Sequence, residues 1–84
     1  MVIRWLSAAL ADLRAINAYI AERNPEAAQQ MIACIRSETF ALAGQPGIGR
    51  IGRISGTREL VITPYPYIAA YREQANEIHI LAVV

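Results

Sequence analysis

Arginine and tyrosine side chains gather in one part of this 84-residue chain. Residues 50–72 hold four of the eight cationic side chains and three of the four tyrosines. A guanidinium group is a planar, bidentate partner for phosphates and carboxylates, and it stays protonated at neutral pH. Such a cluster can recognise or stabilise negative charge, but it cannot move protons. The residues that we expect on the functional surface are Arg50, Arg53, Arg58, Tyr67, Tyr71 and Arg72.

Cleavage of RNA without a metal is one chemistry that clustered arginines could serve. It requires cations around the phosphate, a general base and a general acid. Arg58 and Arg72 would supply the cations, but a base is harder to find. The only histidine, His79, stands in an apolar stretch with no orienting partner nearby in sequence, which is typical of a structural residue. The alternative bases are Glu59, Glu73 and Glu77, but arginines and glutamates of strands more commonly pair across a sheet.

Metal and cofactor chemistry finds no support in the sequence. His79 and the single cysteine, Cys34, have no ligand spacing. The glycines before residue 53 lead into expected strands without the lysine of a phosphate-binding loop, and no nucleophile elbow is present. We therefore expect neither a cofactor nor a metal.

Protein binding agrees better with the composition. Hydrophobic residues make up 55% of the chain, so part of its apolar surface is expected to be covered by a partner. A net charge of +1 provides no general attraction to nucleic acid. The glycine-rich strand expected over residues 47–54 invites strand addition, and a groove between helices and sheet could hold a partner helix.

The first half of the chain predicts a strand and a helical hairpin. Residues 1–6 are typical of a strand, and apolar residues at helical spacing follow over 8–23, with Ser7 as the expected N-cap. Asn24 and Pro25 then predict the cap and first position of a second helix, which extends to Ala43 and ends at Gly44.

The second half predicts four strands, over residues 47–54, 58–63, 67–72 and 78–84. Because the last strand is apolar at nearly every position, we expect it to be central and covered on both faces. The fold class is therefore α+β: an N-terminal strand and a two-helix antiparallel hairpin packed on a mainly antiparallel sheet of four to five strands. Residues 1–84 form one domain with no membrane-spanning run, and the lone cysteine favours the cytoplasm.

The order and spacing of several short motifs resemble those of a known family. The sequence resembles the RelE/ParE superfamily of type II toxin–antitoxin toxins, and within it the ParE-like branch of plasmid-stabilisation proteins in bacteria. The matching residues are Trp5, Ala9, Asp12, Leu13, Ile16, Tyr19, Ile20, Asn24, Pro25, Ala27, Ala28, Pro46, Gly49, Arg50, Gly52, Arg53, residues 56–60, Tyr67, Tyr71 and Arg72.

The resemblance implies a partner and offers two targets. The partner would be a cognate antitoxin that wraps and neutralises the toxin. ParE-like members inhibit DNA gyrase, whereas RelE-like members are ribosome-dependent mRNA endoribonucleases, in which Arg58 and Arg72 would be catalytic. The absence of lysine and the low net charge favour the gyrase inhibitor.

Members of the family usually continue past the last strand with a short tail, and here the sequence stops at Val84. A domain without that tail is expected from the sequence. A form that binds antitoxin without being toxic therefore stands as a third hypothesis.

Overall fold

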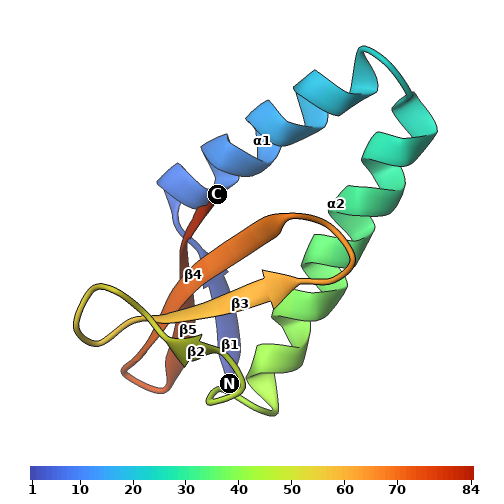
Figure 1. Cartoon of the computed structure of the whole chain (residues 1–84). Helices are drawn as coiled ribbons and strands as arrows, with labels where there is room; N and C mark the ends of the chain where they lie inside the picture. Colours follow the sequence, from blue (N-terminus) through green and yellow to red (C-terminus); the bar gives the residue numbers. More distant parts are fainter.

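The computed structural model describes residues 1–84. The chain forms, in order, β1 (Val2–Trp5), α1 (Ser7–Ala21), α2 (Pro25–Phe40), a short 3₁₀ helix η1 (Ala41–Ala43), β2 (Arg50–Ile51), β3 (Arg58–Ile62), β4 (Tyr67–Gln74) and β5 (Glu77–Val83) (Figure 1). This order of one strand, two helices and four strands confirms the predicted fold class. Neither helix has the length and apolar character that crossing a membrane requires.

The strands form one five-stranded sheet in the order β1-β5-β4-β3-β2. Neighbouring strands are antiparallel except β1, which runs parallel to β5. The first strand therefore lies beside the last, and β5 is an interior strand, as predicted. Both helices lie on one face of the sheet, where α1 crosses close to β5 (Figure 1). The opposite face, which we call the open face, carries no helix.

Local sequence signals explain the start of α2 but not that of α1. The Asn24 side chain accepts a hydrogen bond from the Ala27 N–H at 3.1 Å, and Pro25 takes the first helical position, as predicted. The prediction for Ser7 is wrong: Ser7 is already inside α1, Leu6 holds the cap position, and no side chain caps the helix.

The second helix ends earlier than predicted. It stops at Phe40, and the 3₁₀ turn η1 carries the chain to Ala43. Gly44 then has an ordinary right-handed conformation, with φ −96°.

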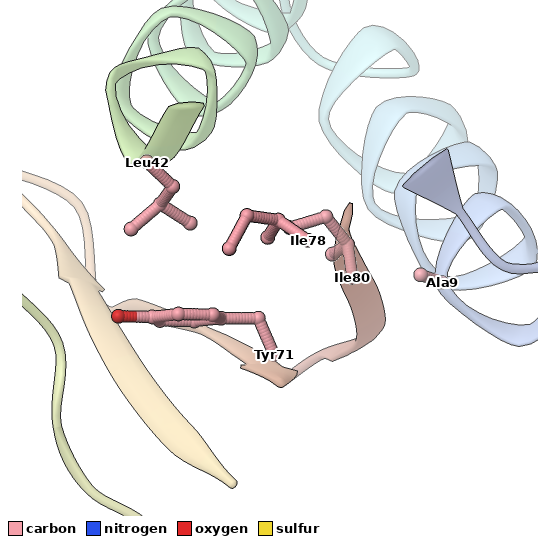
Figure 2. Close-up of a cluster of buried hydrophobic side chains, with 5 residues drawn as sticks. All are labelled: Ala9, Leu42, Tyr71, Ile78 and Ile80. Atoms are coloured by element: carbon pink, nitrogen blue, oxygen red, sulfur yellow. The ribbon is translucent and has the colours of Figure 1, made fainter. Parts of the chain in front are cut away.

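Two clusters of apolar side chains join the helices to the sheet. The first comprises Ala9, Leu42, Tyr71, Ile78 and Ile80, with the Tyr71 ring facing Leu42 and Ile78, and Ala9 of α1 on the far side beside Ile80 (Figure 2). The second cluster comprises Leu13, Met31, Ile35, Ile62 and Ala69.

The prediction that β5 is covered on both faces is wrong. Its buried residues Ile78, Ile80 and Val83 face the helices, while His79 between them lies on the open face. No helix packs on the apolar residues of the open face, because both helices lie on the other side of the sheet.

The β4–β5 hairpin is tighter than the predicted connection over residues 73–76. Its turn consists of Ala75 and Asn76, both with positive φ (50° and 66°), as the twist of a two-residue hairpin requires. Farther along, Ala70 pairs with Ala82 but Tyr71 pairs with Ile80. This shift in register gives β5 one extra residue and bends the sheet.

Candidate functional site

Alternation along the strands divides the predicted site residues between the two faces of the sheet. Arg58 is opposite the fully buried Tyr71, and Tyr67 is opposite the fully buried Ile62, so all these side chains lie on the helix-covered face. Arg72 follows Tyr71 and therefore lies on the open face. That these residues bind a partner stays a prediction. The structure places Arg58 and Arg72 on opposite faces of the sheet and does not bring them together.

Arg50 and Arg53 occupy the edge of the sheet. Arg50 is on β2, opposite Glu59 of β3, and its Nη2 atom lies 3.1 Å from Glu59 Oε1. Arg53 lies in the exposed loop after β2 and takes part in no ion pair or side-chain hydrogen bond. The strand predicted over residues 47–54 is in fact only Arg50–Ile51.

A partly buried hydrogen-bond network holds the segment that leads into β2. The Tyr71 hydroxyl donates to the Pro46 carbonyl at 2.7 Å and accepts from the Gly49 N–H at 2.9 Å. The Arg58 Nη1 atom donates to the Gly49 carbonyl at 2.8 Å and to the Gly47 carbonyl at 3.3 Å. We call this network the loop clamp. Sequence analysis placed Arg58 and Tyr71 on a contact surface and did not predict that they bind the chain's own backbone.

Glycine is required at the clamp for a steric reason. A Cβ atom on Gly49 would lie 2.6 Å from the Tyr71 hydroxyl oxygen, well inside contact distance. At Gly47, two residues earlier, an added Cβ would meet nothing within 4 Å.

Three isoleucines project from the segment that the clamp holds. The repeat Gly-Arg-Ile, Gly-Arg-Ile over residues 49–54 places an isoleucine at every third position from residue 48. Ile48, Ile51 and Ile54 are 49%, 75% and 73% exposed. We call these three side chains the isoleucine ridge. The isoleucines were not among the predicted site residues, although the repeat that contains them is visible in the sequence.

A second polar cluster lies at the opposite edge of the open face. Arg4 of β1 binds the Glu77 carboxylate through Nε (3.1 Å) and Nη2 (3.0 Å), and His79 Nε2 lies 2.9 Å from Glu77 Oε1. The hydrogen bond from Arg4, followed by that from His79, lowers the pKa of Glu77 to about 2. The same pairing raises the pKa of Arg4.

This cluster corrects the expectation that His79 lacks an orienting partner, because Glu77 orients it. It also leaves Glu77 without the free, proton-accepting oxygen that a general base needs, since both carboxylate oxygens are engaged. Arg72 is directly opposite His79 on the next strand and is exposed, without an ion pair.

The helical side of the molecule carries two hollows, which border each other at Arg36. The larger, of about 420 Å³, lies between α1 and α2. Its lining residues are Leu13, Arg14, Asn17, Gln29, Ile32, Ala33 and Arg36. The smaller, of about 300 Å³, lies between β1 and α2. Its lining residues are Ile3, Trp5, Arg36, Thr39 and Phe40. Arg14 and Arg36 form no ion pair within the chain. No group of three or more histidine, cysteine, aspartate or glutamate side chains is placed to hold a metal ion.

A helical hairpin packed on one face of a five-stranded sheet is an architecture that this chain shares with solved toxin–antitoxin structures. The family described as "ParE toxin of type II toxin-antitoxin system, parDE" matches residues 3–84, and the chain belongs to this family.

Relatives by sequence and by structure agree with this assignment. The protein Y4kP of Sinorhizobium fredii (strain NBRC 101917 / NGR234) is 45% identical over 82 residues, which are 98% of this chain and 84% of the relative. Toxin RelE2 of Caulobacter vibrioides is 38% identical over 79 residues, which cover 94% of this chain and 88% of that toxin.

Among solved structures, the chromosomal ParDE toxin–antitoxin system from P. aeruginosa superimposes with a TM-score of 0.90 at 30% identity, covering 99% of this chain and 92% of that one. The intact E. coli RelBE toxin–antitoxin complex gives a TM-score of 0.67 at 10% identity, covering 98% and 92%, and shows the shared fold alone.

Proposed function

We propose that this ParE-family toxin acts on DNA gyrase through protein–protein contacts and is neutralised by a cognate antitoxin. The observation that carries the proposal is the set of hydrogen bonds that Arg58 makes with the chain's own backbone. Its guanidinium donates to the Gly47 and Gly49 carbonyls, on the face of the sheet opposite Arg72. Arg58 and Arg72, the two arginines that would have to contact one phosphate in a nuclease, therefore lie on opposite faces of the sheet.

A RelE-like endoribonuclease is the second candidate, and the name of the relative Toxin RelE2 favours it. Such an enzyme needs cations that converge on one phosphate and a free general base beside them. Here Arg58 is held in the loop clamp, and Glu77 and His79 are bound to each other. These contacts support the gyrase inhibitor over the nuclease.

The antitoxin is proposed from the structural relatives and from the hollows. The ParDE and RelBE structures are a toxin–antitoxin system and a toxin–antitoxin complex, respectively. The hollow between α1 and α2 has an apolar floor with Arg14 and Arg36 at its border, so it suits an amphipathic helix that carries carboxylates. The third hypothesis, a form that binds antitoxin without being toxic, makes the same prediction for this hollow.

Expression of the natural gene product in bacteria, with and without its antitoxin, tests the proposal. We expect growth to stop without antitoxin and the DNA-damage response to rise, because inhibited gyrase leaves broken DNA. Codon-positioned mRNA cuts with no DNA damage would instead support the endoribonuclease. Normal growth together with tight antitoxin binding would support the non-toxic form.

A further inference from the structure

We infer that the isoleucine ridge, with Arg53, is the surface by which the toxin contacts its protein target, and that Arg58 and Tyr71 are positioning residues for this surface. The inference rests on the proposed function and deepens it, because it names the surface and the chemistry of its partner. The partner would be a folded protein that offers an apolar socket bordered by carboxylates.

The ridge combines the side chains that such a socket would recognise. A single exposed isoleucine is ordinary on a protein surface, but here Ile51 and Ile54 are 75% and 73% exposed on one short segment, with Ile48 beside them. Arg53 stands between them without a carboxylate partner in the chain. Arginine is enriched in protein interfaces, and a desolvated guanidinium needs an acidic partner there.

The same composition argues against nucleic acid as the partner. Surfaces that bind single strands combine cations with aromatic side chains on which bases stack. The ridge offers aliphatic side chains in those positions, and the neighbouring Arg50 already pairs with Glu59 at 3.1 Å.

Both ends of the ridge are fixed before any partner binds. The loop clamp holds the backbone at Pro46, Gly47 and Gly49. At the other end, Thr57 donates to the Ile54 carbonyl from its hydroxyl (2.6 Å) and from its N–H (3.1 Å). A contact surface that is rigid beforehand loses less conformational entropy on binding, so the clamp favours affinity.

The ridge lies apart from the hollows assigned to the antitoxin. It borders β2, whereas the smaller hollow borders β1, and these strands form opposite edges of the sheet. In Figure 1 the loop that follows β2 extends away from the α1–α2 hairpin. Changes to the ridge should therefore affect the target contact and spare the antitoxin contact.

The test compares two variants with matched controls in the natural gene product. The double change Ile51→Thr/Ile54→Thr removes ridge surface, with Val61→Thr as control, since Val61 is 47% exposed on β3 outside the ridge. Tyr71→Phe removes the clamp's hydroxyl but keeps the ring, with Tyr65→Phe as control. The measurements are growth arrest, trapping of gyrase on DNA, antitoxin affinity, and amide hydrogen exchange at 25 °C.

We expect the double ridge variant to lose about tenfold or more of its activity in growth arrest, given the apolar area removed, while antitoxin affinity stays within about twofold. Tyr71→Phe should speed exchange of the Gly49 amide and lower activity while the chain remains folded. Both control variants should behave like the wild type.

Full activity of the ridge variant would overturn the inference, and so would an equal loss of antitoxin affinity. Unchanged activity of Tyr71→Phe despite faster exchange would remove the positioning role. If the wild type arrests growth without touching gyrase, the gyrase proposal fails, and the ridge is then judged by growth arrest alone. A wild type that arrests no growth would overturn both.

Discussion

Tyr71 and Arg58 show how the role of a side chain depends on the face of the sheet it occupies. Both are polar groups of the kind that bind ligands, yet each forms two hydrogen bonds with the backbone of residues 46–49. Arg72, one position after Tyr71, faces the open side and forms none. Arg58 therefore serves structure on the helix-covered face, while Arg72 on the open face remains available for contact.

Gly49→Ala tests the steric side of the clamp. The new Cβ would press on the Tyr71 hydroxyl, which is fully buried and cannot move without losing its hydrogen bonds. We expect a loss of about 1–3 kcal/mol in the free energy of unfolding, measured by urea denaturation. Gly47→Ala is the control, because nothing lies within 4 Å of its added Cβ. Equal stability of the two variants would show that the clamp tolerates the extra methyl group.

Glu77→Gln tests the polar cluster through its pH dependence. The pKa of Glu77 is lowered from 4.5 to about 2 in the folded chain, so its ionised form stabilises the fold above pH 4.5. That contribution is lost as the pH falls from about 4.5 to about 2. We expect the wild type to lose more stability than Glu77→Gln over this range when urea denaturation is followed at several pH values. Parallel curves for the two proteins would contradict the ion pair, and Glu73→Gln serves as an exposed control.

Sequence analysis could identify these residues but not their partners. It predicted that strand arginines and glutamates would pair, and Arg50 with Glu59 does so across adjacent strands. It could not pair Arg4 with Glu77, because they are 73 positions apart and meet only through the parallel pairing of β1 with β5. The loop clamp was hidden for the same reason, since its contacts depend on which face each side chain takes.

The secondary-structure elements divide into those that local signals define and those that tertiary packing defines. The start of α2 follows from Asn24 and Pro25, and the order of the elements along the chain follows from the pattern of turns. The length of β2 does not follow from local signals. The glycines on either side of it permit many backbone conformations, and the loop clamp selects one. It was also not predictable that helices cover only one face of β5, because an apolar strand does not reveal on which side the helices pack.

Asn24→Ala tests the signal that begins α2. The Asn24 side chain accepts from the Ala27 N–H, so its loss leaves a donor of the first turn without its partner. We expect the free energy of unfolding to fall by about 1 kcal/mol in thermal or urea denaturation. Ser7→Ala should change it far less, because Ser7 caps nothing. A larger effect at Ser7 would contradict the helix start described for α1.

At the scale of the whole molecule, our proposals assign the antitoxin and the target to separate surfaces. The larger hollow on the helical side is lined mainly by apolar surface and carries Arg14 and Arg36 without ion pairs, which suits the proposed acidic amphipathic antitoxin segment. The isoleucine ridge at the β2 edge suits a folded target. The family and the architecture were predictable from sequence, because the order of motifs and of elements can be read from local features along the chain. The target was not, because it depends on side chains that converge only after folding.

Trapping of gyrase on DNA shows directly whether this toxin acts on gyrase. Purified toxin is mixed with gyrase, ATP and supercoiled plasmid. The amount of linear DNA is then quantified after gyrase has been denatured and digested. We expect the toxin to raise the amount of linear DNA in a dose-dependent way, and added antitoxin to abolish the effect. Unchanged plasmid at a large excess of toxin, with codon-positioned cuts in mRNA of a translating extract, would contradict the gyrase proposal.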